Sequence, residues 1–499
     1  MKIVKSKKQL TPFTILFILT IIAITLTWII PSGSYSKLIY NNNKNSLQIT
    51  TPNGNVNYIA STQESLKNLN ISIDIDKLIK GEIKNSIPIP NTYEKVKDVK
   101  KNIFDITLSM VKGTVEVADI IIFILILGGM IGVIKKTGAL DSFIFNISNK
   151  AENNKFLFVI AIFIVMLIGG TTCGLEEEAI AFYPMIVPVL ILFGFDAIVC
   201  VTIIFLSASI GSTFSTLNPF SVIIASNLAG VSFLDGIWYR VAGLILTSCF
   251  VLTYLYFYIK KINSNPQKSY SYENHNDFKS NYKYKKTNFK KISNKDKLIL
   301  SFFILPFIIM IIGVSSFGWW FNEMSATFLF SSIIIILISG LSENKAISCF
   351  ITGASELIGV SLIIGLARGI NLILEQGMIS DTIIFYATSL INGMDSYLFV
   401  FALMIMFFIF GFIIPSSSGL AVLTMPIIAP LADTIGVPRD VVVSAYNWGQ
   451  YTMLYIAPTG LILANLQMLS ISYKQWLKFA TPLTMFVFLL SSSLLMIQV

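Results

Sequence analysis

Long apolar runs separated by short polar stretches make up most of the chain. Many of these runs hold eighteen or more residues, enough for a helix to cross a hydrocarbon core of ~30 Å. The first run, 14–30, is longer than a signal-peptide core and leads into "IIPSGSY" without a small-residue cleavage site, so we expect a retained transmembrane helix. The pattern predicts an all-α polytopic membrane protein.

The composition agrees with a membrane protein and excludes several kinds of chemistry. Of the 499 residues, 54% are hydrophobic and 13% are charged, whereas soluble domains carry roughly 25% charged residues. The single histidine, His275, stands in a polar stretch, which excludes most zinc and Ser-His chemistry. The four cysteines are scattered singly and indicate neither a disulfide framework nor a metal site. We therefore expect no enzyme activity, no metal and no cofactor.

The positive charge is concentrated in one segment, 259–297, which holds eleven lysines against three acidic residues. A basic run with interleaved tyrosines could bind nucleic acid or anionic lipid. A cytoplasmic loop that follows the positive-inside rule explains it better, and we expect no nucleic-acid partner. The lysines at 2, 5, 7 and 8 then place the N-terminus in the cytoplasm. Residues 31–112 become an extracytoplasmic segment that could form a small strand-rich cap.

Two long apolar blocks resemble each other at a constant offset of about 240 residues. "GTVEVADIIIFILILGGMIGVIKKTGALDSFI" (113–144) aligns with "GASELIGVSLIIGLARGINLILEQGMISDTII" (353–384). The prolines at 184, 188 and 219 fall opposite those at 426, 430 and 458. The loop after the first block is basic and its counterpart is acidic, so the positive-inside rule places them on opposite sides of the membrane. Such an inverted repeat is typical of secondary transporters.

The chain is accordingly divided into seven segments. They are a first transmembrane helix (1–30), the extracytoplasmic segment (31–112), a first inverted repeat (113–258), the basic cytoplasmic loop (259–297), a connecting helix pair (298–345), a second inverted repeat (352–474) and a last transmembrane helix (475–499).

Each repeat contains an apolar stretch interrupted by small and polar residues. "GGTTCGLEEEAIAFYP" (169–184) and "FGFIIPSSSGLAVLTMPIIAP" (410–430) both predict re-entrant hairpins, whose exposed backbone is tolerable at membrane depth only around an enclosed cavity. A second break follows at Asn218-Pro219 and Ala457-Pro458, where proline frees backbone groups. One such break alone could be a kinked packing helix, but breaks at equivalent positions of two repeats favour a binding site.

The predicted substrate-binding residues come from these breaks. They are Thr171, Thr172, Glu176, Glu177, Glu178, Asn218, Ser416, Ser417, Ser418, Gly419, Asn447 and Thr459, with Arg368 in "GLARGI" as a further candidate.

The serines and the glutamates suggest opposite chemistry. Serine hydroxyls and backbone amides at the start of a half-helix suit an anionic group, although small residues also allow close helix packing. Carboxylates at membrane depth cost several kcal/mol unless they are paired or solvated, so they are functional by default; the alternative is a position at the membrane edge. Successive helical residues point in different directions, so not all three glutamates can face one cavity.

Arg368 is open to three interpretations. It could hold a substrate carboxylate, pair with one of the three glutamates, or extend to the external interface.

These motifs resemble the C4-dicarboxylate anaerobic carrier family, and within it the YfcC-like branch of basic amino acid antiporters. The likeness covers most of the chain and is most specific in "IPSSSGLAVLTMPIIAPLAD", with "WIIPSGSY", "GLARGI", "GLEEEAIAFYPMIVP" and "STLNPF" in support. The resemblance implies the ion-transporter superfamily fold: a homodimer with a scaffold domain and an elevator-like transport domain. It also implies that the hairpins and breaks form the site. The segment "WGQYTML" departs from the family pattern.

The three glutamates favour a substrate with an α-carboxylate and a cationic side chain, because they would repel a dianion unless protonated. We therefore expect a secondary transporter of basic amino acids in the bacterial inner membrane, with arginine exchanged for ornithine as the sharpest hypothesis. The alternative is a proton- or sodium-coupled carrier of C4-dicarboxylates or other carboxylates. An intramembrane hydrolase using the serine run lacks a histidine partner, and a channel fits inverted repeats less well than alternating access does.

Overall fold

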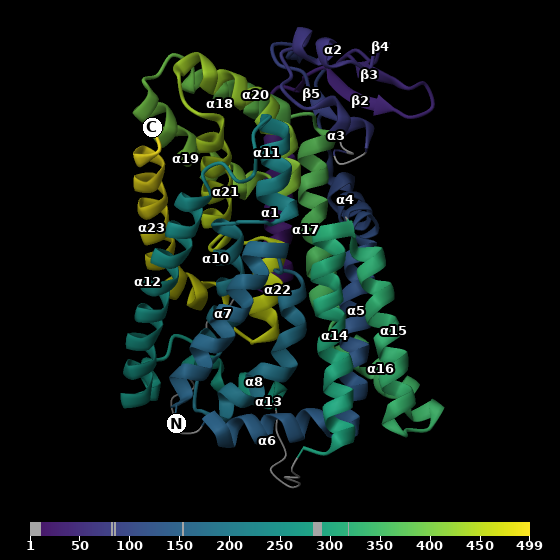
Figure 1. Cartoon of the computed structure of the whole chain (residues 1–499), viewed down its shortest axis with the longest axis vertical. Coiled ribbons are helices and arrows are strands. Elements are labelled where there is room, and N and C mark those ends of the chain that lie inside the picture. Colours follow the sequence, from purple (N-terminus) through teal and green to yellow (C-terminus); the bar gives the residue numbers. More distant parts are fainter. Residues whose placement is uncertain (1–10, 81–82, 84–85, 152–153, 283–291, 318) are drawn as a thin grey trace.

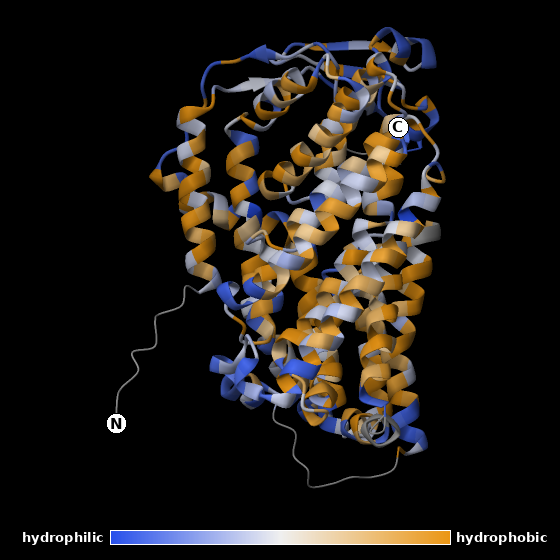
Figure 2. Ribbon diagram, turned by 90° about the vertical axis from the view of Figure 1, so that its left-hand side faces the viewer, coloured by the Kyte–Doolittle hydropathy of each residue, from blue (hydrophilic) through white to orange (hydrophobic). Residues whose placement is uncertain are grey.

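The computed structural model describes residues 11–80, 83, 86–151, 154–282, 292–317 and 319–499. The N-terminal lysines that orient the chain, and residues 283–291 of the basic loop, lie outside the described residues. Within them, ten helices are long and apolar enough to cross a membrane. A broad hydrophobic belt lies between two hydrophilic ends (Figure 2). The predicted class, a mostly helical polytopic membrane protein, is confirmed.

Residues 31–102 fold into a small unit at one end of the molecule, which we call the cap (Figure 1). Its described elements are β1 (Gly33–Ser34), β2 (Lys37–Asn41), β3 (Ser46–Thr50), β4 (Val56–Ala60), α2 (Gln63–Asn68), α3 (Ile75–Ile79), β5 (Ile87–Pro88) and β6 (Glu94–Lys95). Four strands form an antiparallel sheet in the order β4-β3-β2-β5, and β1 pairs with β6. The sheet buries Leu38, Leu47 and Ile87 on one side, as expected for alternating side chains.

The cap ends ten residues before the predicted boundary at 112, because Asn102 begins a helix. Its side chain accepts from the amides of Phe104 and Asp105, and Asp105 accepts in return from the amide of Asn102. This reciprocal capping fixes the start of α4 (Ile103–Glu116).

Two long, interrupted helices form the centre of a group that we call the long-helix group. One consists of α4 and α5 (Ala118–Thr137), the other of α16 (Glu343–Glu356) and α17 (Ile358–Gln376). They run antiparallel, since α4 packs on α17 and α5 packs on α16. Gly113 lies against the backbone of Gly369, so a side chain at either position would separate the helices. The group also contains α1 (Pro12–Ile29), α14 (Asn294–Phe317) and α15 (Phe321–Ser339).

The remaining helices form two series with the same order, which we call the hairpin group. The first series is α6 (Ala139–Ala151), α7 (Lys155–Cys173), η2 (Glu178–Phe182), α8 (Tyr183–Leu192), α9 (Ala197–Val201), η3 (Thr202–Leu206), α10 (Ser207–Thr213), η4 (Pro219–Ile223), α11 (Ile224–Ala229) and α12 (Ile237–Ser264). The second is α18 (Ser380–Ile391), α19 (Ser396–Ile413), α20 (Ser417–Ile435), α21 (Arg439–Leu454), α22 (Gly460–Met468) and α23 (Tyr473–Ile497). The corresponding helices α6 and α18 lie at opposite ends of the molecule (Figure 1).

Each series contains a helical hairpin whose two ends lie together. In the first hairpin, α7 to α8, the Lys155 ammonium donates to the carbonyl of Phe193 (3.4 Å). In the second, α19 to α20, the Ser396 hydroxyl donates to the carbonyl of Ile435 (3.2 Å). Each tip therefore lies about one helix length inside the molecule, and each series also has a break, at 214–218 and at 455–459.

Part of the basic loop is folded. Residues 265–282, which we call the inner segment, contain η5 (Pro266–Lys268), η6 (Tyr272–Asn274) and α13 (His275–Asn281). The segment lies at the end of the molecule opposite the cap (Figure 1).

Candidate functional site

The tip of the first hairpin rests on the first break. Helix α7 ends at Gly174, which has a φ of +69°, a conformation that favours glycine. A Cβ there would lie 2.8 Å from the side-chain nitrogen of Asn218. Asn218 itself accepts from the amide of Phe220 (2.9 Å) and so begins η4. The predicted residues of the first tip and the first break are thus brought together.

The two threonines at the end of α7 differ in their use. The Thr171 hydroxyl donates to the carbonyl of Phe214 (3.1 Å) and accepts from the amide of Thr216 (3.1 Å), so it satisfies backbone groups that the break frees. The Thr172 hydroxyl donates to Ile168 within its own helix (2.7 Å). Thr171 therefore builds the site, while Thr172 is engaged locally.

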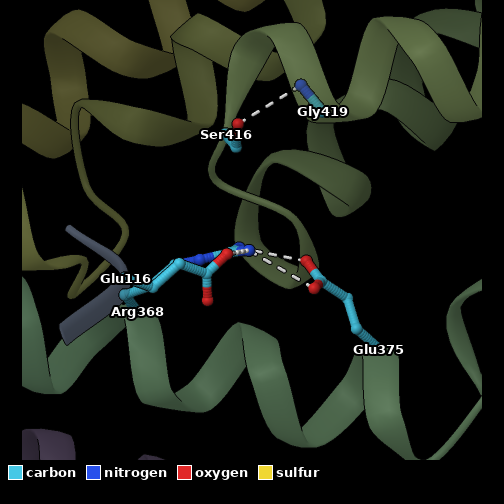
Figure 3. A network of polar contacts seen from close by, with 5 residues as sticks. All are labelled: Glu116, Arg368, Glu375, Ser416 and Gly419. Atoms are coloured by element: carbon cyan, nitrogen blue, oxygen red, sulfur yellow. Dashed lines mark hydrogen bonds and ion pairs between the residues drawn. The ribbon is translucent and has the colours of Figure 1, made fainter. Parts of the chain in front are cut away.

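The tip of the second hairpin reaches across to the first series. The Ser417 hydroxyl donates to the carbonyl of Phe220 (3.1 Å), and the Tyr446 hydroxyl donates to the carbonyl of Ser417 (2.7 Å). Ser416 caps α20 by accepting from the amide of Gly419 (3.2 Å; Figure 3). Of the three serines, only Ser418 has a hydroxyl without a hydrogen bond in the described part of the chain. This tip is thus the N-terminus of a helix of 19 residues.

Helix α21 joins the first break to the second hairpin through two amide side chains. Asn447 donates to the carbonyls of Ser212 (3.0 Å) and Thr213 (2.7 Å) at the end of α10. Gln450 donates to the carbonyl of Ile414 (3.3 Å) at the end of α19. Because the NH₂ groups donate to these carbonyls, the amide oxygens point away from them. Both oxygens are buried and have no hydrogen-bond partner among the described residues.

The three glutamates occupy different surroundings. Glu176 is 6% exposed, lies beside Ser209 and Ser212 of α10, and faces Tyr451 and Tyr455 of α21. One oxygen of this carboxyl group, Oε1, is buried without a hydrogen-bond partner in the described chain. Glu176 is therefore the glutamate that faces the interior between the two series.

Glu178 is also buried and lies near Cys173, with its Oε2 unpartnered among the described residues, whereas Glu177 is half-buried. The ion pairs formed by the described residues include none of the three glutamates. Three carboxyl groups thus lie together at this tip, and no cationic side chain of the described residues is bound to them.

Arg368 lies elsewhere, on α17 of the long-helix group. It binds Glu116 (2.5 Å) and Glu375 (3.0 Å), as Figure 3 shows. The sequence suggested that Arg368 could pair with one of the glutamates at 176–178. In the structure its ionic partners are Glu116 and Glu375 instead. Arg368 is thus paired within the long-helix group, and a contact with the substrate or a position at the external interface stays a prediction.

Thr459 lies on the boundary between the two groups. With Pro458 and Pro415 it lines a cavity of about 80 Å³ whose other walls come from α1, α17, the end of α19 and the start of α22 and are almost entirely apolar. The structure therefore separates Thr459 from the polar residues around Glu176.

Sequence reasoning missed most of the polar residues that surround Glu176. Beside Glu176 they are Ser209, Ser212, Tyr451 and Tyr455. Tyr446 and Gln450 of α21, also missed, donate to the carbonyls of Ser417 and Ile414 at the second hairpin. A signal was present: the segment "SAYNWGQYT" (444–452) is polar around the whole helix, yet every one of its residues is buried. A polar helix inside an apolar protein indicates a binding site, because buried polar groups need partners.

The chain matches the C4-dicarboxylate anaerobic carrier family, DcuC, over residues 11–499. It belongs to this family. An uncharacterized protein of Haemophilus influenzae is 51% identical over 501 residues, which covers 99% of this chain and 98% of the relative. The Escherichia coli K12 protein named "Putative basic amino acid antiporter YfcC" is 30% identical over 385 residues, or 75% of this chain and 76% of the relative. The resemblance to the family and its YfcC-like branch is thus confirmed.

Two solved structures of transport proteins align along nearly the whole chain at low similarity. MtrF of Neisseria gonorrhoeae, described with a class of antimetabolite efflux pumps, has 14% identity and a TM-score of 0.39, with 99% of this chain and 96% of MtrF covered. The YdaH transporter of Alcanivorax borkumensis has 11% identity and a TM-score of 0.39, with 97% of each chain covered. Together with the family, the ten apolar helices establish a multi-pass membrane transporter.

Proposed function

We propose that this family member transports basic amino acids across the bacterial inner membrane, and that it exchanges arginine for ornithine. The observation that carries the proposal is the buried carboxyl group of Glu176, for which the described part of the chain offers no partner to one oxygen and no cationic side chain. A substrate cation would supply the missing partner.

The unpartnered oxygens of Glu176 and of helix α21 favour a donor-rich ligand. The unpartnered oxygens of Glu176, Asn447 and Gln450 are all acceptors. Each buried acceptor left without a partner costs about 1–3 kcal/mol. A guanidinium group carries five N–H donors and no acceptor, so it could satisfy several of these oxygens together. A dianion would add negative charge beside them.

The second hairpin offers a place for the α-carboxylate. The N-terminus of α20 carries a partial positive charge and backbone N–H groups that bind anions. The unengaged hydroxyl of Ser418 lies in its first turn. An amino acid with a cationic side chain would then extend from the serine tip towards Glu176.

Transport requires that the site face each side of the membrane in turn. We propose that the long-helix group is the scaffold of a homodimer and that the hairpin group moves against it as an elevator, with both hairpins re-entrant and the N-terminus cytoplasmic. Two series of corresponding elements, whose first helices α6 and α18 lie at opposite ends of the molecule, support this mechanism. The apolar cavity beside Thr459 lies where the two groups meet.

A proton- or sodium-coupled carboxylate carrier is the second candidate. The serine tip of α20, which suits a carboxylate, favours it, and so does the name of the family. In such a carrier the glutamates would be protonated or would bind the coupling ion.

Counterflow in proteoliposomes separates the two candidates. Vesicles loaded with ornithine should accumulate labelled arginine, and vesicles loaded with succinate should not accumulate labelled succinate. Succinate counterflow without an arginine signal would contradict the proposal and establish the carboxylate carrier.

A further inference from the structure

The cap and the inner segment lie at opposite ends of the hairpin group and cover corresponding elements. The cap contacts α11 and α20, the half-helix of the first series and the second arm of the second hairpin. The inner segment contacts the end of α22 and the turn between α8 and α9, which are the counterparts of these elements. The two extramembrane units thus occupy equivalent places in the repeat.

The cap is bound firmly to the junction of α17 and α18. Ser32 donates to the carbonyl of Gly377 (2.8 Å), and the buried carboxylate of Asp381 accepts from the Ser34 hydroxyl (3.1 Å). The Tyr93 ring stacks on Phe385 with 4.1 Å between centroids. At either end the cap continues into α1 and α4, and both of these helices pack on α17. The chain itself and the Ser32 bond thus attach the cap to the long-helix group, while Asp381 and Phe385 attach it to α18, the helix that follows α17 directly and begins the second series.

Three further contacts tie the cap to the hairpin group. The Lys77 ammonium donates to the side-chain oxygen of Asn227 on α11 (2.6 Å). The backbone of Ser72 lies directly against Gly230, the residue that ends α11. Strand β5 packs on α20. The first two of these contacts border a polar pocket of about 420 Å³ between the cap and the end of α11.

The inner segment has the opposite attachment. Asp196, between α8 and α9, accepts from Tyr258 of α12 (2.5 Å) and from Ser269 of the segment (2.6 Å). Asn274 donates to the carbonyl of Ser470 (2.6 Å), and Tyr282 donates to the carbonyl of Met468 (3.2 Å). All of these partners belong to the hairpin group. A movement of that group would leave them intact.

We propose that the cap is an external clamp that holds α11 and α20 in place and must release them in each transport cycle. The inner segment, in contrast, travels with the hairpin group. The inference rests on the proposed movement of the hairpin group against the long-helix group. It does not depend on which substrate is carried.

Chemical cross-linking tests the clamp in the full-length protein. Lys77→Cys with Asn227→Cys joins the cap to α11, and Asn281→Cys with Ser470→Cys joins the inner segment to the loop after α22; both pairs are hydrogen-bonded in the structure. The accessible Cys249 and Cys349 are first replaced by serine. A short bis-methanethiosulfonate linker should reduce arginine counterflow at least tenfold for the cap pair, reversibly with reductant, and less than twofold for the inner pair. Unchanged counterflow with the cap pair fully linked would overturn the clamp, as would equal loss with both pairs.

A distance measurement decides the same question if no arginine counterflow is found. Spin labels at exposed positions, Asn55→Cys on the cap and Leu234→Cys on the hairpin group, should give two distance populations in lipid nanodiscs. The pair Asn276→Cys and Lys474→Cys should give one. Adding Lys77→Ala should at least double the longer population of the cap pair. A single distance for the cap pair, unchanged by Lys77→Ala, would overturn the clamp, whereas two populations without arginine transport would contradict only the proposed substrate.

Discussion

At the tip of the first hairpin three glutamates follow Leu175, whereas at the tip of the second hairpin three serines follow Pro415. The serines open α20 directly and place its N-terminus at the tip. The glutamates stand before and within a short 3₁₀ turn, and Glu176 turns towards α10 and α21. The corresponding tips of the two series thus differ in chemistry: one carries an acidic cluster and the other a serine-capped helix N-terminus. An internal repeat can therefore supply both halves of a site for a zwitterionic substrate with a cationic side chain.

The tips also differ in how they are held. Asn218 of the same series supports the first tip, while Phe220 and Tyr446 hold the second from two other elements. Because the second tip depends on a contact with the other series, a change in either series can alter it.

The largest expected effect is on the acidic tip. Glu176→Gln removes a buried charge that would pair with the substrate cation, and the loss of one partner of such a pair costs about 2–5 kcal/mol. We expect arginine counterflow to fall about thirtyfold or more, and discrimination between arginine and its uncharged analogue citrulline to disappear. Initial uptake rates for both compounds measure this effect.

The matched control is Glu343→Gln, the same chemical change at an exposed position at the start of α16. Counterflow should stay near that of the unaltered protein. Retention of arginine selectivity in Glu176→Gln would remove the acidic tip from substrate recognition.

A smaller effect is expected at the serine tip. Ser418→Ala removes a hydroxyl that is not needed to cap α20, and one hydrogen bond contributes about 1 kcal/mol. The apparent KM for arginine should rise about fivefold. Inhibition by agmatine, which lacks the α-carboxylate, should be unchanged. An equal loss for agmatine would show that Ser418 does not read the carboxylate.

The smallest effect on transport is expected for Arg368→Gln, outside both tips. Arg368 binds two glutamates of the long-helix group, so its loss should lower stability by about 1.5–3 kcal/mol. The rate of counterflow should change by about threefold at most. Thermal unfolding in detergent and initial rates measure the two quantities. A loss as large as that of Glu176→Gln would instead place Arg368 at the substrate.

The apolar runs, the repeat and the breaks were all readable from the sequence. An apolar helix ends where small and polar residues interrupt the run of apolar ones, and this interruption is visible in consecutive residues. The ends of the helices around 174–178 and 414–416 could therefore be predicted within a few positions. The start of α4 was not predicted within the segment 31–112. The capping of this helix by Asn102 depends on a few residues inside a stretch of mixed composition, so the hydrophobic pattern does not reveal it.

The choice among the three glutamates could not be made from the sequence. Three neighbouring glutamates have the same chemistry and differ only in the direction of their side chains. That direction is set by the residues that pack around each of them. Ser209, Ser212 and α21 decide it for Glu176. The pairing of Arg368 was equally undecided, since Glu116 lies 252 positions away in the chain.

The sequence by itself determined a polytopic membrane protein of this family with two similar apolar blocks and two chemically different tips. The tertiary structure alone decided how the amides of Asn447 and Gln450 are oriented, with their NH₂ groups bound to carbonyls and their oxygens pointing away. It also decided which glutamate faces the interior, Glu176. Finally, it placed the cap in contact with both helix groups. The physical reason is the same in each case. Periodicity and composition act along the chain, whereas the orientation of a polar group is fixed by partners that folding brings from elsewhere.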